Sequence, residues 1–293
     1  MLRLKHILMA TDFCRISTAA LSHALGIAKR CHSTVSILHV INPPFFDMTR
    51  EDLSTALDCA EREAKKLTKQ LESEGLVAGL SVDVAITVGP VWPTIANVLA
   101  EKNSGLLVLG THGRSGLGKF VLGSVAESAF REAPCPVLTV GPMAATCRTS
   151  GGAAKHLLVP TDLSPESTYA LRYGLSLARA TGGDVTLLHV LKLRKKATGE
   201  GASQAALVKG RLDQFLSEHP DAATMVVARV EFGDPARLIV RVAEQSGADL
   251  IVMGVRAWSA EGPPMWQTAY NVLLQAHCPV VSMKVPLVSA NEP

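Results

Sequence analysis

Short apolar segments alternate with longer segments of helical periodicity along the whole chain. In the first half, residues 6–10 (HILMA), 35–41 (VSILHVI) and 106–110 (LLVLG) are continuous apolar runs, which are typical of strands buried on both faces. Residues 80–88 (LSVDVAITV) alternate apolar and polar positions, as a partly exposed strand does. Residues 136–140 (PVLTV) provide a fifth strand.

The segments between these strands have apolar residues at helical spacing. The first carries Ala20, Leu21, Ala24, Leu25 and Ala28 on one face, and Ser17 or Thr18 is expected to cap it. The predicted helices cover residues 17–31, 50–74, 93–102 and 124–132. Strict alternation of strands and helices predicts a parallel sheet with helices on both faces.

The chain contains this pattern twice. Residues 5–41 align without a gap to residues 155–191, at an offset of 150 and with 15 identities in 37 positions. Residues 89–110 also match residues 233–254, and residues 133–140 match residues 276–285, so we predict two tandem copies of one doubly wound α/β domain. The predicted domains are residues 1–142 and 155–293, joined by a Gly-, Ser-, Thr- and Ala-rich linker at 143–154.

Composition limits the classes of function. The net charge of +3 is too small to predict a nucleic-acid surface, and no basic face interleaved with aromatic residues is found. The six cysteines are scattered and form no C-x-x-C pair, which favours reduced thiols in a cytoplasmic protein. No apolar run is long enough for a membrane span, and residues 5–12 recur at 155–162, so the N-terminal segment is interpreted as a strand and not as a signal peptide.

The glycine-rich segment 110–124 (GTHGRSGLGKFVLGS) is the strongest candidate for a ligand site. Open α/β sheets bind ligands beyond the carboxyl ends of their strands, where this segment and residues 10–12 (ATD) are expected to meet. A P-loop is disfavoured, because Phe120 stands where a hydroxyl must bind Mg²⁺. The glycines instead allow backbone amides to face an anion at the start of a helix, with Arg114 and Lys119 adding positive charge. The alternative is a glycine-rich connector without a ligand.

The spacing Gly110-x2-Gly113-x9-Gly123-Ser124, with Thr11-Asp12 after the first strand, resembles the universal stress protein family. The resemblance covers nearly the whole chain as a tandem pair. It implies a five-stranded parallel sheet of order 3-2-1-4-5 in each domain and, in one branch of the family, ATP bound through this motif. Mg²⁺ or Mn²⁺ would then be held mainly by phosphate oxygens, and no protein metal ligand is assigned. The implied nucleotide-binding residues are Ala10, Asp12, Val40, Gly110, Thr111, His112, Gly113, Arg114, Ser115, Gly116, Gly123, Ser124 and Val125.

The second copy departs from this motif. Thr161 and Asp162 persist, but Ala257 replaces the second glycine and no Gly-Ser pair opens the last helix. Two tryptophans and two prolines occupy the same segment, so we expect this domain to bind nucleotide weakly or not at all.

The residues and the resemblance together predict a nucleotide-binding protein, and the resemblance alone implies a role in stress-response signalling. An enzyme is not expected, since no general base or paired nucleophile stands out. Any ATP hydrolysis is expected to be slow. A slow ATPase or nucleotide-dependent transferase, and a scaffold that binds no nucleotide, remain the alternatives. The resemblance also implies pairing of the two domains through their last strands as an intra-chain pseudo-dimer, and it allows a homodimer; no membrane or nucleic-acid partner is expected.

Overall fold

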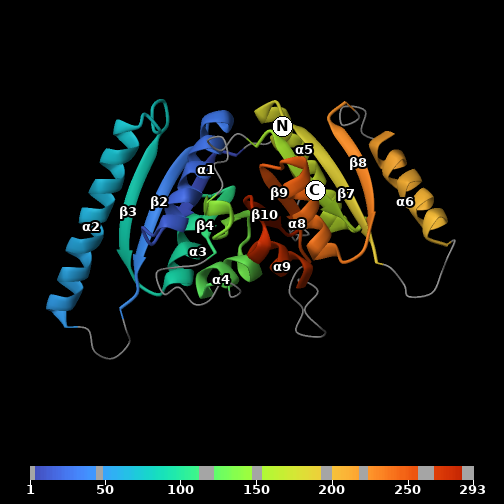
Figure 1. The fold of residues 1–293 in the computed structure, drawn as a ribbon. Helices are drawn as coiled ribbons and strands as arrows, with labels where there is room; N and C mark the ends of the chain where they lie inside the picture. Colours follow the sequence, from blue (N-terminus) through green and yellow to red (C-terminus); the bar gives the residue numbers. More distant parts are fainter. Residues whose placement is uncertain are drawn as a thin grey trace, which may run out of the picture. The chain divides into compact units, whose positions relative to one another are not determined.

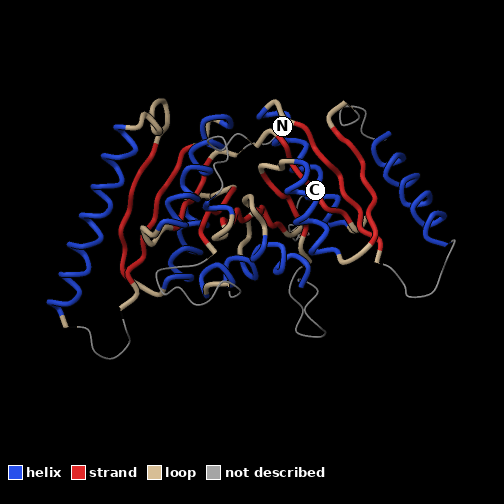
Figure 2. The backbone as a smooth tube through the Cα atoms, in the orientation of Figure 1, coloured by secondary structure: helices blue, strands red, loops and turns tan. Residues whose placement is uncertain are grey.

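The computed structural model describes residues 4–43, 49–111, 122–146, 154–192, 200–217, 224–256 and 267–285. The chain divides into two compact units, with the boundary between Ala153 and Ala154. Each unit alternates strands and helices, and helices flank the strands of each (Figures 1 and 2). The predicted α/β class with two tandem copies is therefore confirmed.

The first unit contains five strands and four α-helices among its described residues, and a 3-10 turn follows. In chain order they are β1 His6–Ala10, α1 Arg15–Cys31, β2 Thr34–Ile41, α2 Arg50–Ser73, β3 Val82–Val88, α3 Val91–Glu101, β4 Leu106–Gly110, α4 Ser124–Glu132, β5 Val137–Val140 and η1 Ala144–Thr146. The strands are parallel in the order β3-β2-β1-β4-β5, which confirms the predicted 3-2-1-4-5. Because crossovers are right-handed, α1 and α2 lie on one face and α3 and α4 on the other.

The second unit repeats this order. Its elements are β6 His156–Thr161, α5 Pro165–Thr181, β7 Asp184–Leu191, α6 Glu200–Ser217, β8 Val226–Phe232, α8 Pro235–Ser246, β9 Leu250–Gly254, α9 Gln267–Gln275 and β10 Val280–Met283. The strands are parallel in the order β8-β7-β6-β9-β10. Both sheets therefore reverse their strand order between the first and fourth strands of the unit.

The central strands form the core of each unit. Ile7, Leu8 and Met9 of β1 have no exposed surface, and Leu158 and Val159 of β6 are equally buried. Continuous apolar runs are required here because helices cover both faces of these strands. Burial of the central strands fixes the position of their carboxyl ends.

The starts of the helices were predicted less well. The prediction that Ser17 or Thr18 caps α1 is wrong: the helix begins at Arg15, and Cys14 Sγ accepts a hydrogen bond from the Ser17 amide at 3.5 Å. Ser164 caps α5 in the same way. Periodicity locates the buried face of a helix, but its first turn is held by the cap and need not follow the apolar pattern.

A buried histidine at the amino end of β1 forms hydrogen bonds with β2 and with the segment before β4. His6 is 7% exposed, and its ring nitrogens lie 2.8 Å from Ser104 Oγ and 2.8 Å from Ser36 Oγ. Ser36 donates to Asp83 Oδ1 at 2.7 Å, so Ser36 accepts from His6 Nε2–H and Ser104 donates to Nδ1. Burial lowers the pKa of His6, Lys102 lowers it further, and Asp83 opposes both.

Candidate nucleotide site

A tight turn after β1 holds the first candidate residues. The Thr11 hydroxyl accepts a hydrogen bond from the Phe13 amide at 2.9 Å, and Asp12 Oδ1 accepts one from the Cys14 amide at 3.1 Å. Phe13 has a left-handed backbone, with φ of 61°. Thr11 also donates to Ser17 Oγ at 3.1 Å, which ties the turn to the first turn of α1. The short polar side chains therefore set the local path of the backbone.

The pKa of Asp12 is lower than that of an ordinary aspartate. Burial acts to raise it, but hydrogen bonds from Cys14 and Ser17 together outweigh burial. Asp12 is therefore ionised at neutral pH and presents acceptors only.

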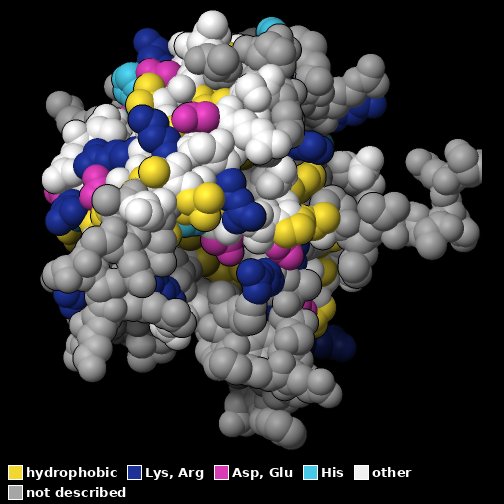
Figure 3. All heavy atoms as spheres, turned by 90° about the vertical axis from the view of Figure 1, so that its right-hand side faces the viewer, with side chains coloured by type: hydrophobic (Ala, Val, Ile, Leu, Met, Phe, Trp, Pro, Cys, Tyr) yellow, Lys and Arg dark blue, Asp and Glu magenta, His cyan; other side chains and the backbone are white. Residues whose placement is uncertain are grey.

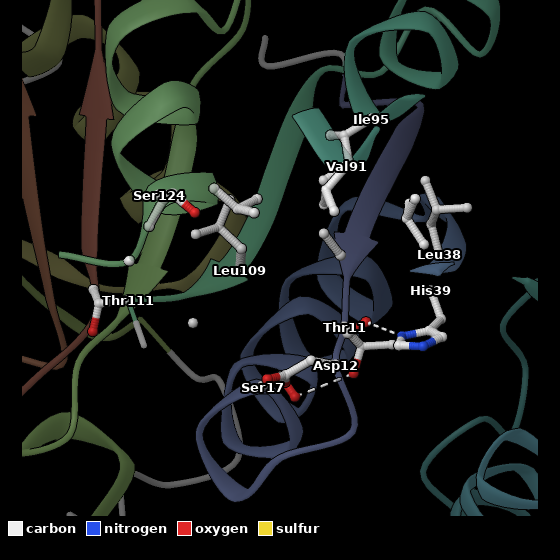
Figure 4. Close-up of a pocket in the computed structure, with 16 residues that line it drawn as sticks. Thr11, Asp12, Ser17, Leu38, His39, Val91, Ile95, Leu109, Thr111 and Ser124 are labelled. Atoms are coloured by element: carbon white, nitrogen blue, oxygen red, sulfur yellow. Dashed lines mark hydrogen bonds between the residues drawn. The ribbon is translucent and has the colours of Figure 1, made fainter. Parts of the chain in front are cut away.

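His39, at the end of β2, packs against this turn. Its Nδ1 donates to the Thr11 carbonyl at 2.7 Å, and its ring lies 4.7 Å from the Phe13 ring, centroid to centroid. This hydrogen bond occupies Nδ1 and fixes the ring beside Asp12 (Figure 4). These contacts give His39 a structural role in holding the turn after β1.

A cavity of about 230 Å³ opens at the carboxyl ends of β1, β2 and β4 (Figure 4). It is lined by Ala10, Thr11, Asp12, Ser17, Leu38, His39, Val40, Val91, Ile95, Leu109, Gly110, Thr111, Gly123, Ser124, Val125 and Ala126. One wall is apolar, formed by side chains of β2, α3 and β4, and Asp12 and Ser124 supply polar groups. The location matches the reversal of strand order, where open α/β sheets bind ligands.

The start of α4 forms part of this cavity. Gly123 is its N-cap residue, with extended backbone at φ −63° and ψ 149°, and no side chain caps the helix among the residues described. The Gly123 amide donates to the Thr111 carbonyl at 2.8 Å, which fixes the N-cap residue beside the end of β4. The following amides of the first turn have no partner within the helix, so the helix start carries partial positive charge.

Eight of the predicted site residues line the cavity: Ala10, Asp12, Val40, Gly110, Thr111, Gly123, Ser124 and Val125. Five others, His112, Gly113, Arg114, Ser115 and Gly116, lie outside the described residues. Sequence reasoning missed the wall formed by Leu38, Val91, Ile95 and Leu109, as well as Ser17 and Ala126. The recurrence of Leu38 as Leu188 at the 150-residue offset was a usable signal, whereas nothing marked Val91 and Ile95 as cavity residues.

The second unit repeats the turn and has a cavity of its own. Thr161 accepts from the Leu163 amide at 3.0 Å, Asp162 accepts from the Ser164 amide at 3.0 Å, and Leu163 has φ of 64°. The cavity has a volume of about 510 Å³. It is lined by Pro160, Thr161, Asp162, Ser164, Glu166, Ser167, Leu188, His189, Val190, Lys192, Pro235, Ile239, Met253, Gly254, Val255, Arg256, Thr268 and Ala269.

Charged groups distinguish this second cavity. Arg256 Nη2 lies 3.5 Å from Asp162 Oδ2. Burial acts to raise the pKa of Asp162, but hydrogen bonds from Ser164 and Ser167 bring it below the ordinary value. Burial lowers the pKa of His189, against the opposing effects of the Thr161 carbonyl and Asp162.

The described residues contain neither a cluster of metal ligands nor a helix suited to a membrane. No group of three or more His, Cys, Asp or Glu side chains in this part of the chain is arranged to hold a metal ion. No helix in the same residues is long and apolar enough to cross a membrane. On the face drawn in Figure 3, basic, acidic and apolar side chains are interspersed.

Comparisons with known proteins agree with the fold. A universal stress protein of Methanocaldococcus jannaschii is 33% identical over 141 residues, which cover 46% of this chain and 81% of the relative. One from Mycolicibacterium smegmatis is 27% identical over 261 residues, 85% of this chain and 86% of the relative. The crystal structure of a universal stress protein from Archaeoglobus fulgidus has a TM-score of 0.72 at 21% identity, covering 97% of this chain and 98% of that chain.

The family model extends over both units. The model described as the universal stress protein family matches residues 3–141 and again residues 153–284. The two matches coincide with the repeated strand order and with the repeated turn of Thr11 and Thr161. The chain belongs to the universal stress protein family, with two tandem copies of its domain.

Proposed function

We propose that the first unit binds ATP and that the protein acts as a nucleotide-dependent component of a stress response. The observation that carries this proposal is the cavity beside Asp12, where an apolar wall, an ionised carboxylate and an uncapped helix start converge. A nucleotide has the matching parts: a flat base, ribose hydroxyls and phosphates.

The base would lie against the apolar wall of Leu38, Val40 and Ile95. Asp12 would accept hydrogen bonds from the ribose hydroxyls, and the phosphates would extend toward Ser124 at the start of α4. The cavity volume of about 230 Å³ agrees with this placement of base, ribose and phosphates. It lies below the ~300–1,000 Å³ of typical small-molecule pockets, so the cavity encloses the nucleoside end while the phosphates lie at the open helix start.

The remaining parts of the proposed site rest on sequence. Gly113, Arg114 and their neighbours would contact the ribose and phosphates, as the motif spacing implies. Mg²⁺ or Mn²⁺ would be held mainly by phosphate oxygens. The ion would neutralise phosphate charge there.

Storage and sensing of ATP are favoured over turnover. Hydrolysis needs a group that positions or activates water. Asp12 has a lowered pKa, which makes it a weak base. The competing functions are a slow ATPase or transferase, which would show turnover above a buffer control, and a scaffold that binds no nucleotide.

Calorimetric titration of nucleotide-free protein with Mg-ATP tests the proposal. We expect about one site per chain. Gly123→Val should abolish binding without unfolding, because the extended backbone of Gly123 accepts a non-glycine residue and Gly123 lines the cavity, so the added side chain should reduce the space for the nucleotide. ATP at a hundredfold its Kd should stabilise the first unit by about 2.7 kcal/mol.

A pair of matched variants locates the site. Asp12→Asn keeps the acceptor for the Cys14 amide but removes the charge, and Asp162→Asn makes the same change in the second unit. Only Asp12→Asn should weaken ATP binding. Equal effects of the two variants, or binding that survives Gly123→Val, would contradict the assignment to the first unit.

A further inference from the structure

We propose that the cavity of the second unit is a separate binding site for a small molecule with a flat apolar ring and a single anionic group. The proposal goes beyond ATP binding by the first unit and does not depend on it. It rests on three features of the second cavity: its size, its apolar wall and the ion pair at its edge.

The size and the wall fit a small molecule. The cavity has a volume of about 510 Å³, which lies within the ~300–1,000 Å³ of typical ligand pockets. Leu188 and Val190 of β7, Ile239 of α8 and Met253 of β9 line it. Side chains from these three elements provide apolar surface for a ring system.

The ion pair at the edge supplies the polar contacts. The side chains of Arg256 and Asp162 are 47% and 61% exposed, and an exposed pair at 3.5 Å contributes ~0–1 kcal/mol. A ligand can therefore replace this contact at little cost. Its anionic group would bind the planar guanidinium of Arg256, and a hydroxyl or amine of the ligand would donate to Asp162.

The charges of the side chains that line the cavity favour a ligand with one anionic group. Arg256 and Lys192 line the cavity together with two carboxylates, those of Asp162 and Glu166. Among the described residues that line the cavity these charges cancel, so a single anion that engages Arg256 is accommodated, whereas a triphosphate meets two carboxylates. The sequence before Gln267 also lacks the Gly-Ser pair that opens α4 in the first unit.

Two kinds of molecule share this chemistry: a nucleoside monophosphate and an aromatic carboxylate. AMP and indole-3-carboxylate are suitable probes, with adenosine and ATP as the uncharged and polyanionic comparisons. The whole chain would be titrated calorimetrically in the Gly123→Val background, in which the first unit is expected not to bind nucleotide. The loss of ATP binding in that background tests the first site, and the Arg256 variants below test the second, so the two proposals fail separately.

Arg256→Gln is the decisive variant. Loss of a charge-assisted hydrogen bond should weaken anion binding about tenfold to a hundredfold. Arg256→Lys should have an intermediate effect, because it keeps the charge but loses the planar fork. Arg241→Gln is the matched control: Arg241 also pairs with a carboxylate, that of Glu231 at 4.0 Å, but it does not line the cavity.

The outcomes separate the possibilities. Binding of AMP that Arg256→Gln weakens and Arg241→Gln does not would support a phosphomonoester ligand, and the same pattern with indole-3-carboxylate alone would support a carboxylate. The proposal is overturned if neither anion binds, if adenosine or ATP binds as tightly as the anions do, or if Arg256→Gln has no effect.

Discussion

The turn after β1 provides a sharp test of how the fold positions the site. Thr11→Val keeps the size and the β-branched shape of the side chain but removes its hydroxyl. The hydroxyl makes two hydrogen bonds, from the Phe13 amide at 2.9 Å and to Ser17 Oγ at 3.1 Å. Thr161→Val is the matched change, since Thr161 makes the same contacts with Leu163 at 3.0 Å and Ser167 at 3.0 Å.

The magnitude follows from these contacts. Each hydrogen bond contributes ~0.5–1.5 kcal/mol, so the loss of both should lower the free energy of unfolding by about 1–3 kcal/mol. We expect the lower half of this range, because both contacts are only partly buried and water can reach the freed groups. The Phe13 backbone, at φ of 61°, loses an acceptor that holds it in the left-handed region.

Of the two variants, only Thr11→Val should affect ligand binding in the cavity of the first unit. Thr11 is followed by Asp12, and its carbonyl accepts the hydrogen bond from His39. If reordering the turn costs ~1 kcal/mol on binding, the Kd for ATP rises about fivefold. Thr161→Val should leave this Kd unchanged.

The assay combines urea unfolding with calorimetric titration of each variant. Two variants with similar losses of stability, of which only Thr11→Val weakens ATP binding, would agree with the geometry. A loss of stability below about 0.5 kcal/mol for Thr11→Val would refute the role of the hydroxyl in the turn. An equal loss of ATP affinity in Thr161→Val would refute the link between this turn and the first cavity.

Three further predictions concern stability. His32→Gly should stabilise the first unit by about 0.5–1 kcal/mol in urea unfolding, since His32 ends α1 at φ of 54° where Gly182 ends α5 at φ of 65°; a destabilised variant would contradict this. The pKa of His6 in the folded state lies below the ordinary value of 6.5, so the unfolded chain binds more protons. The free energy of unfolding should therefore be highest above pH 6.5 and fall as the pH decreases. His6→Gln should flatten this dependence in unfolding measured from pH 7.5 to 5. Gly254→Val should destabilise the second unit by ~2 kcal/mol or more, because a side chain there would clash with the backbone of Glu166 at the start of α5; an unchanged unfolding midpoint would show that the helix start moves freely.

Hydrophobic patterning was sufficient for the strands and weaker for the helix starts. The runs of β1 and β4 were predicted to the residue, because burial on both faces leaves His6 as the only polar side chain within these two strands. The third helix was predicted to begin at Pro93, but α3 begins at Val91. Proline is tolerated anywhere in the first turn, whose amides lack partners within the helix, so it does not mark the first residue.

The site was only partly predictable for a different reason. Asp12, Gly110 and Gly123 belong to loops whose residue types have local chemistry, and such loops can be read directly. Val91 and Ile95 have no local mark: they are apolar residues of an apolar helix, and only the packing of α3 beside β2 turns them toward the cavity. Which apolar residues face the cavity therefore depends on tertiary packing, which a short sequence motif does not encode.

Thr161 and Asp162 recur in the second unit for a structural reason that does not depend on a ligand. Both side chains bind backbone amides of their own turn, as Thr11 and Asp12 do. The pair is therefore required by the path of the chain after the first strand of each unit, whether or not a nucleotide is bound. Its presence in both units predicts the turn. The difference in ligand that we propose for the two units therefore rests on groups that they do not share, the helix start at Gly123 in one and Arg256 in the other.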